Sequence, residues 1–331
     1  MSQVNHRFTL AARPVGMTKP TDFAYGEAPV REPAAGEILV KVRYISLDPA
    51  MRGWMNDYKS YIAPIGIGEL FRAGAIGEVV ASNDPAFAPG DHALGMLGVQ
   101  EYATVAAKDA TKILPIAPLP LFLSGLGMPG LTAYFGLLDV GRPQPGETVV
   151  VSGAAGAVGA QVGQIAKIKG CRAVGIAGGA DKCAYLRELG FDAAIDYKAE
   201  DVAAALREHC PDGIHVFFDN VGGAILDAAL ARLAMHARVV LCGGISQYNA
   251  TGKITGPSNY LSLLVNRASM TGMIVFDYAA RYPQAIAEMA GWMSEGKLRS
   301  KEHIVRGLEN FPSAFNMLFT GENHGKLILE V

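Results

Sequence analysis

The chain has 331 residues, which suggests two domains of roughly 150 residues each. Half of the residues are hydrophobic, 18% are charged and the formal net charge is −2, so we exclude an intrinsically disordered chain. No Lys/Arg-rich run supports binding to nucleic acid or to an anionic membrane, and no secretory signal is recognisable, so we expect a cytoplasmic protein. The cysteines form no CxxC pair, and we expect free thiols at Cys171, Cys183, Cys210 and Cys242.

The N-terminal part, up to about residue 120, is predicted to be rich in strands. Strand-like segments at 38–45, 74–80 and 101–105 are separated by turn signals, a pattern that favours a small barrel or sandwich. The following segment, 113–138, has no charged residue and is long enough to span a bilayer. Its prolines and glycines would break a single helix, so we interpret it as a crossing between domains.

Apolar strands alternate with helical patterns from about residue 147. The strands are continuous apolar runs, which is typical of a sheet covered on both faces. This βαβ alternation predicts an α/β fold with a doubly wound parallel sheet. The predicted strands are 148–152, 172–177, 194–196, 214–219, 238–242 and 269–276, and the predicted helices lie near 157–169, 181–189, 199–209 and 224–233.

The C-terminal segment contains elements that a parallel sheet does not need. We expect a helical stretch at 279–296, then a short strand, a helix near 312–319 and a final strand at 326–331. We therefore expect the C-terminus to return to the first domain.

A glycine-rich turn follows the first strand of the parallel sheet, with Gly153, Gly156 and Gly159 spaced as GxxGxxG. Such a turn between a strand and a helix brings backbone N–H groups and the positive helix end to a dinucleotide pyrophosphate. A tight turn of this kind also occurs without a ligand, but here it opens a series of βαβ units. We predict a cofactor contact along the turn, by Ala155, Gly156, Ala157, Val158 and Gly159.

The end of the second strand distinguishes NADP from NAD. An NAD site carries an acidic residue there for the ribose 2′-hydroxyl, whereas this chain has small residues followed by Lys182. Room and positive charge suit a 2′-phosphate, so we predict NADP(H). The alternative is a solvated lysine that Asp181 partly neutralises.

Several segments together carry a family resemblance that covers essentially the whole chain. They resemble the medium-chain dehydrogenase/reductase superfamily, in its zinc-independent branch of prostaglandin reductase-like alkenal/enone reductases. The segments are Ser46–Arg52, Gly130–Tyr134, Ala154–Gly159, Asp219–Gly223, Gly243–Asn249 and Gly321–Lys326.

The resemblance implies a GroES-like substrate domain, residues 1–124 and 300–331, and a Rossmann dinucleotide-binding domain, residues 125–299. It implies a homodimer joined near 269–276. It also implies these cofactor contacts: Lys182 and Tyr197 at the 2′-phosphate, Asn220, Cys242, Gly243, Ile245 and Ser246 at the nicotinamide riboside, and Phe276 and Asn323 at the carboxamide.

Zinc dehydrogenases of the same architecture take Cys and His ligands from the substrate domain. This chain has no cysteine before Cys171 and no histidine between His6 and His92, so we expect no metal. Reduction of a conjugated carbonyl needs a hydrogen-bond donor at the enolate oxygen and a proton at the α-carbon. Tyr248 is our catalytic and substrate-binding candidate. The alternative is that it only packs on the cofactor and that water supplies the proton.

Two further residues are substrate candidates. Arg52 has a planar donor fork that suits a substrate carboxylate, although a structural role is an equal alternative. Tyr61 is a candidate for the mouth of the substrate site. We predict an NADPH-dependent reductase of small-molecule enones or alkenals. A quinone reductase of the same fold and a non-catalytic NADPH-binding sensor are the alternatives.

Overall fold

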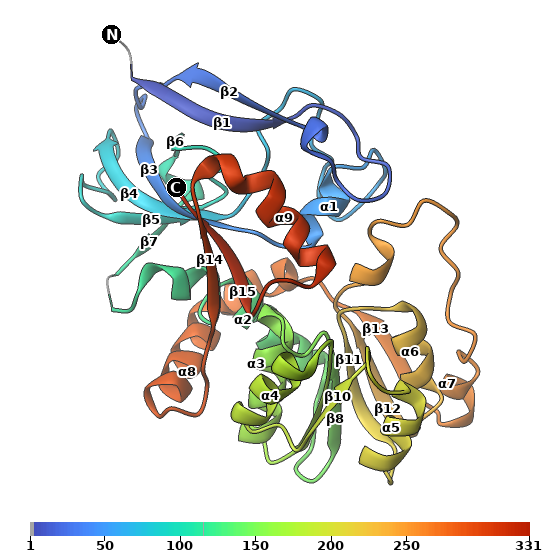
Figure 1. Ribbon diagram of the computed structural model, residues 1–331. Helices are drawn as coiled ribbons and strands as arrows, with labels where there is room; N and C mark the ends of the chain where they lie inside the picture. Colours follow the sequence, from blue (N-terminus) through green and yellow to red (C-terminus); the bar gives the residue numbers. More distant parts are fainter. Residues whose placement is uncertain (1–2, 115) are drawn as a thin grey trace. The chain divides into compact units, whose positions relative to one another are not determined.

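The computed structural model describes residues 3–114 and 116–331 (Figure 1). The chain forms two compact units. The first contains the chain up to residue 123 together with 302–323 and 327–331, and the second contains 124–301 and 324–326. No helix in the described ranges combines the length and the hydropathy needed to cross a membrane.

The first unit is built mainly from antiparallel strands. Its strands are β1 Val4–Leu10, β2 Phe23–Pro29, β3 Glu37–Ser46, β4 Ala75–Ser82, β5 His92–Gly95, β6 Tyr102–Ala106, β7 Thr111–Ile113, β14 Glu302–Arg306 and β15 Lys326–Glu330. Its α-helices are α1 Ala50–Trp54 and α9 Phe311–Thr320, and its short 3₁₀ helices are Pro20–Asp22, Ala107–Asp109, Leu119–Leu123 and Leu308–Asn310.

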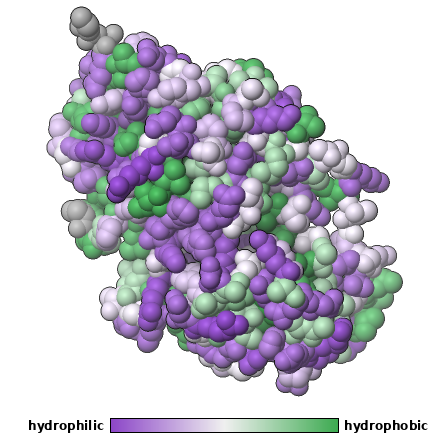
Figure 2. Space-filling view, in the orientation of Figure 1, coloured by the Kyte–Doolittle hydropathy of each residue, from purple (hydrophilic) through white to green (hydrophobic). Residues whose placement is uncertain are grey.

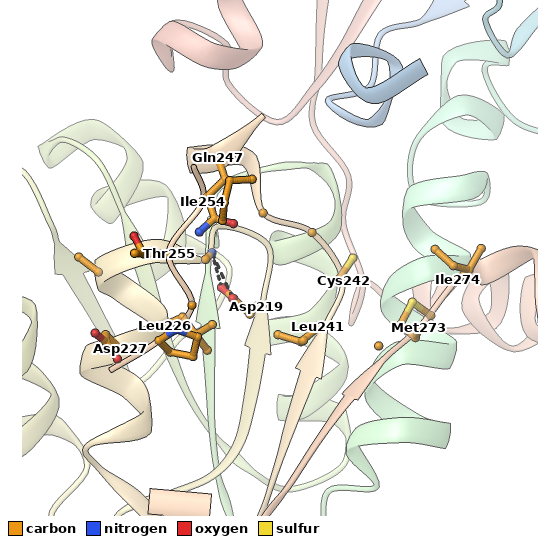
Figure 3. A pocket seen from close by; sticks show the side chains of 18 of the residues that line it. Asp219, Leu226, Asp227, Leu241, Cys242, Gln247, Ile254, Thr255, Met273 and Ile274 are labelled. Carbon is orange, nitrogen blue, oxygen red and sulfur yellow. Dashed lines mark hydrogen bonds between the residues drawn. The ribbon is translucent and has the colours of Figure 1, made fainter. Parts of the chain in front are cut away.

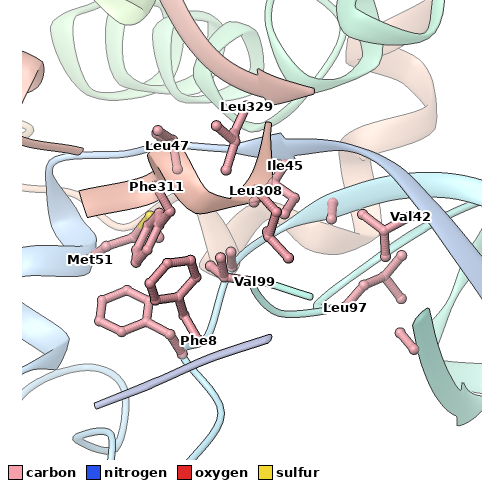
Figure 4. Close-up of a cluster of buried hydrophobic side chains, with 14 of the residues drawn as sticks. Phe8, Val42, Ile45, Leu47, Met51, Leu97, Val99, Leu308, Phe311 and Leu329 are labelled. Atoms are coloured by element: carbon pink, nitrogen blue, oxygen red, sulfur yellow. The ribbon is translucent and has the colours of Figure 1, made fainter. Parts of the chain in front are cut away.

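The C-terminal strand completes the main sheet of the first unit. β15 pairs antiparallel with β3, so that Leu329 lies opposite Ile45. α9 contributes to the core beneath this sheet, where the rings of Phe8 and Phe311 lie 5.2 Å apart (Figure 4). Burying such aromatic side chains stabilises the unit and ties its N- and C-terminal segments to one core.

The second unit is an α/β unit. Its strands are β8 Thr148–Ser152, β9 Arg172–Ala177, β10 Ala193–Asp196, β11 Ile214–Asp219, β12 Leu233–Leu241 and β13 Ser269–Gly272. Its helices are α2 Met128–Phe135, α3 Ala157–Ile168, α4 Ala180–Glu188, α5 Val202–His209, α6 Gly223–Leu230, α7 Ser262–Val265 and α8 Tyr282–Ser294. A π-helical turn spans Gly136–Gly141, and 3₁₀ turns span Ile245–Gln247 and Val275–Arg281.

The six strands of the second unit run parallel in the order β10-β9-β8-β11-β12-β13. The chain moves outward from β8 to β10 and then returns to place β11 beside β8. In a sheet wound in both directions, the crevice at this reversal is the usual ligand site. The predicted fold class, a doubly wound parallel sheet with a β-rich domain, is confirmed.

Candidate functional site

The glycine-rich turn leaves β8 at Ser152 and enters α3 at Ala157. Gly153 has a φ of +59°, a conformation that glycine adopts without strain. A Cβ at Gly159 would lie 2.4 Å from the carbonyl oxygen of Gly153 and 2.7 Å from Cα of Ala154. The turn therefore folds onto the first turn of α3 so tightly that only glycine fits at 159. Because the turn packs directly on the helix, its backbone N–H groups lie at the edge of the sheet, where a pyrophosphate group would bind.

Lys182 and Tyr197 lie on adjoining parts of the same sheet edge. Lys182 is in the first turn of α4, and Tyr197 directly follows β10. A Cβ on Gly178 would lie 2.7 Å from Cε1 of the Tyr197 ring, so the ring packs directly against this glycine. The structure thus brings the two predicted 2′-phosphate residues to neighbouring turns.

A second lysine adds positive charge to this corner. Burial, together with repulsion from Lys198, lowers the pKa of Lys182 below its ordinary value of 10.5. Asp196 joins the two turns, because its Oδ1 accepts hydrogen bonds from the N–H groups of Gly179 at 2.8 Å and Lys198 at 3.0 Å. Two lysines therefore lie at this corner beside the Asp196 carboxylate that joins its turns, and lysine ammonium groups can bind a phosphate dianion.

Asn220 connects the glycine-rich turn to the loop after β12. Its side-chain N–H donates to the carbonyl oxygen of Ser152 at 2.8 Å, and its own carbonyl accepts the N–H of Ile245 at 3.2 Å. The Ser246 hydroxyl donates to the carbonyl of Val221 at 2.6 Å. The predicted riboside residues therefore gather at the ends of β11 and β12, next to the end of β8.

Tyr248 closes the loop that begins at Cys242. Its phenolic oxygen accepts the backbone N–H of Gly244 at 3.1 Å. Asn220 also lies close, since a Cβ on Gly243 would be 3.1 Å from the Tyr248 oxygen and 3.4 Å from the Asn220 carbonyl. The candidate catalytic phenol is thus held at the same sheet edge as the predicted cofactor residues.

A pocket of about 750 Å³ opens at the ends of β11, β12 and β13 (Figure 3). Asp219, Cys242 and Gly243 are among its lining residues, and Met273 and Ile274 supply apolar surface. Burial, with added repulsion from Asp219, raises the pKa of the Cys242 thiol to about 12. The thiol is therefore neutral at physiological pH and unsuited to act as a nucleophile or metal ligand.

The last strand is shorter than the sequence pattern predicts. β13 ends at Gly272, whose partner is Leu241, the last residue of β12. Beyond that point the strand has no neighbour to pair with, and Val275–Arg281 forms a 3₁₀ turn instead. Phe276 therefore lies in this turn, half-exposed.

Three predicted site residues belong to the first unit. Arg52 is buried, and its guanidinium donates to the carbonyls of Pro14 at 3.2 Å and Gly16 at 3.0 Å. These bonds favour the structural alternative, and its carboxylate-binding role stays a prediction. Tyr61 is exposed. Asn323 directly precedes the 324–326 segment, which belongs to the second unit.

Asp219, Ser152 and Lys198 were not singled out from the sequence as candidate site residues. Asp219 and Ser152 are fully buried, and their side chains hydrogen-bond to each other at 2.7 Å. One sequence feature could have pointed to Ser152 and Asp219: each is a polar residue at the end of an apolar strand, β8 and β11 respectively. Because the ends of neighbouring parallel strands meet at one edge, such residues are candidates for a shared site.

Across the ranges that the structure describes, no group of three or more His, Cys, Asp or Glu side chains is arranged to hold a metal ion. Structural and catalytic zinc sites need three or four such ligands.

Comparisons with known proteins agree on one family. The family described as "N-terminal domain of oxidoreductase" matches residues 6–113, and the family described as "Zinc-binding dehydrogenase" matches residues 157–291. The chain is 44% identical to the NADPH-dependent curcumin reductase of Escherichia coli K12, over 99% of this chain and 97% of that protein. It is 40% identical to the NADP(+)-dependent 2-alkenal reductase of Nicotiana tabacum, over 90% and 88%.

A solved structure extends this similarity to the fold. CurA from Vibrio vulnificus in complex with NADPH has a TM-score of 0.93 and 44% identity, covering 98% of this chain and 99% of that one. Identity at this level over almost the full length of both chains shows common descent as well as a common fold. The chain belongs to the medium-chain dehydrogenase/reductase family of oxidoreductases, as its sequence motifs predicted.

Proposed function

We propose that this protein is an NADPH-dependent reductase of the carbon–carbon double bond of α,β-unsaturated aldehydes and ketones. One observation carries the proposal: the glycine-rich turn, the Lys182 corner and the Tyr248 loop all lie at the carboxyl edge of one parallel sheet. Full-length similarity to a curcumin reductase and a 2-alkenal reductase supports the same class of reaction.

The residues of the second unit fit the parts of NADPH. The turn at 155–159 offers backbone N–H groups and the start of α3 to the pyrophosphate. Lys182 and Tyr197, with Lys198 nearby, offer charge and a hydroxyl to the 2′-phosphate. Asn220 and the loop from Cys242 to Ser246 hold the riboside, while Phe276 holds the carboxamide. When bound, NADPH supplies the hydride that adds to the β-carbon of the acceptor.

Tyr248 donates a hydrogen bond to the carbonyl oxygen of the acceptor in this proposal. Negative charge develops on that oxygen as the β-carbon is reduced, and a fixed donor stabilises it. The α-carbon then takes a proton from Tyr248 or from water. We propose that the reaction needs no metal, because the ligand set that zinc requires is missing from the described residues.

The same proposal includes a homodimer. β13 is an edge strand of the sheet, and an edge offers unpaired backbone groups to a second strand. Hydrophobic side chains gather at the surface over α7 beside it (Figure 2). Leu264 is 75% exposed and Val265 is 68% exposed. A second copy of this chain would cover both the edge and the apolar side chains.

We also propose a substrate-binding role for the first unit and a cytoplasmic location. The four cysteines, all within the described ranges, are free thiols, and three of them are buried. Free thiols are typical of a reducing compartment.

The test is a set of parallel oxidation assays with NADPH and NADH against a trans-2-alkenal, an aryl enone and a quinone. We expect rapid NADPH oxidation with the enone or alkenal and a saturated carbonyl product. NADPH deuterated at C4 should leave its label on the β-carbon, and a reaction in heavy water should label the α-carbon. An allylic alcohol, or turnover of the quinone alone, would contradict the proposal.

A further inference from the structure

The carboxylate of Asp219 is the centre of a buried hydrogen-bond network. It is fully buried at the end of β11, the strand that lies between β8 and β12. Oδ1 accepts the Ser152 hydroxyl at 2.7 Å and the N–H groups of Gly222 at 3.0 Å and Val221 at 3.1 Å. Oδ2 accepts the Gly222 N–H at 3.1 Å. Both oxygens therefore accept hydrogen bonds, as carboxylate oxygens do, and burial raises the pKa of Asp219 above its ordinary value of 3.8.

The backbone of Asp219 holds the loop on the other side. Its carbonyl oxygen accepts the N–H groups of Cys242 at 2.9 Å and Gly243 at 3.1 Å. The side chain thus binds the end of β8, and the main chain binds the start of the loop that leads to Tyr248. One residue connects the ends of three adjacent strands.

Ser152 extends the network by a second route. Its hydroxyl oxygen accepts the Asn220 N–H at 2.8 Å while donating to Asp219. Asn220 in turn accepts the N–H of Ile245, inside the same loop. The glycine-rich turn and the Tyr248 loop are therefore connected through Asp219 and through Ser152 and Asn220.

We propose that Asp219 is a positioning residue, which sets the spacing between the glycine-rich turn at 153–159 and the loop at 242–248. This inference rests on the proposed function, because the turn is assigned to the pyrophosphate and the loop to the nicotinamide end of NADPH. Asp219 lines the pocket at the sheet edge, but it acts through the backbone that it fixes. A ligand that contacts both the turn at 153–159 and the loop at 242–248 binds well only if the distance between them is fixed.

The network requires a carboxylate rather than an amide. Asn at position 219 would keep the shape of the side chain but replace one acceptor oxygen with an N–H₂ donor. That donor would then face either the Gly222 N–H or the Ser152 hydroxyl. Facing Gly222, the new donor would have no acceptor, and the Gly222 N–H would keep only its bond to the remaining oxygen. A buried donor without an acceptor is costly.

The test compares Asp219→Asn, Ser152→Ala and the double variant with wild type. NADPH binding is measured by titrating its fluorescence, together with the thermal midpoint and the separate kcat and KM. We expect Asp219→Asn to weaken NADPH binding by roughly 10- to 100-fold, since hydrogen bonds to a buried charge are lost. The emission of bound NADPH should shift toward that of free NADPH. Ser152→Ala should show a smaller effect, and the double variant should lose less than the two effects combined.

Asp192→Asn is the matched control. The Asp192 carboxylate also accepts a backbone N–H, from Ala173 at 2.7 Å, and it pairs with Lys167. It directly precedes β10, at the amino end of the same sheet and therefore away from the proposed site. We expect any change in this variant to appear in the thermal midpoint alone, with NADPH binding equal to wild type.

The outcomes separate the positioning role from a general loss of stability. Wild-type NADPH affinity in both Asp219→Asn and Ser152→Ala overturns the inference. Equal losses of affinity in the Asp219 and Asp192 variants overturn it as well. A wild-type protein that binds NADPH but reduces no enone would remove the proposed reaction, and the binding comparison would still decide the role of Asp219.

Discussion

The phenolic oxygen of Tyr248 lies 3.1 Å from the backbone nitrogen of Gly244 and accepts its hydrogen bond. This bond fixes the hydroxyl within its own loop, beside the ends of β11 and β12. A phenol oxygen that accepts one hydrogen bond can still donate through its own proton. The geometry is therefore compatible with a donor to the substrate carbonyl as well as with a structural role.

Tyr248→Phe separates these two roles. Removal of the hydroxyl should lower kcat with an enone about 100-fold, the effect expected for the loss of a catalytic donor. NADPH affinity, measured by fluorescence titration, should change little. Tyr260→Phe, at an exposed tyrosine farther along the same segment, is the control and should retain full activity. Unchanged turnover in Tyr248→Phe would remove its catalytic role.

Lys182→Ala should change the choice between the two nicotinamide cofactors. We expect kcat/KM for NADPH to fall by roughly 10- to 100-fold, because a charge-assisted bond to the 2′-phosphate is lost. The value for NADH should be unaffected, since NADH lacks that phosphate. Lys198→Ala should act in the same direction but more weakly, because Lys198 is exposed. Lys167→Ala, which removes an ion pair with Asp192, serves as the control.

The pH dependence of this preference follows from the lowered pKa of Lys182. A lysine with a lowered pKa loses its charge at a lower pH than its ordinary value of 10.5. The ratio of NADPH to NADH efficiency should therefore fall with rising pH, and the fall should begin below 10.5. A ratio that stays constant up to that pH would contradict the assignment of Lys182 to the 2′-phosphate.

Gly159→Ala tests the tight turn before α3. The new methyl group would meet backbone atoms of Gly153 and Ala154, which cannot rotate away. We expect a loss of stability of about 1–3 kcal/mol and weaker NADPH binding. Gly291→Ala is the control, because its new methyl group on α8 would meet no atom within 4 Å. We expect this substitution to leave stability unchanged or to raise it slightly. Thermal unfolding and NADPH titration measure both effects, and wild-type behaviour of Gly159→Ala would contradict the proposed site.

His6 gives the first unit a pH-dependent contact. Its Nδ1 lies 2.9 Å from Glu101, and that hydrogen bond raises the pKa of His6 above 6.5. The contact stabilises the fold fully below 6.5 and is lost as pH rises through the raised pKa. The thermal midpoint of wild type relative to His6→Gln, followed from pH ~5 to ~8, should show this loss. Glu101→Gln should abolish most of this pH-dependent difference in thermal midpoint. Glu27→Gln should remove much less of it, because the Glu27 carboxylate lies 3.6 Å from Nε2 of His6.

Leu264→Asp tests the proposed homodimer. A charge on α7 would make burial of this surface unfavourable, while the exposed position leaves the fold of the monomer intact. We expect light scattering to report a dimer for wild type and a monomer for the variant. Ile116→Asp, at a side chain in the first unit that is 74% exposed, should stay dimeric. A monomeric wild type would contradict the proposal directly.

The sequence alone predicted the parallel sheet well. The strands 148–152, 172–177 and 214–219 have the bounds of β8, β9 and β11. These strands are buried on both faces, so they are continuous apolar runs that local sequence reveals. The glycine-rich turn was equally visible, because a tight turn between strand and helix restricts the residues at each of its positions. The end of β13 was missed, because it depends on where its neighbour β12 ends.

Contacts between distant segments were decided by the tertiary structure. The Ser152–Asp219 bond joins residues 67 positions apart, and it exists because the strand order places β11 beside β8. The charged side chain of Arg52 was visible in the sequence, but only the fold shows that it donates to the carbonyls of Pro14 and Gly16. Local patterns of hydrophobicity and glycine determine which elements form. The order in which those elements pack determines which polar side chains meet, and that order is set by burial over the whole unit.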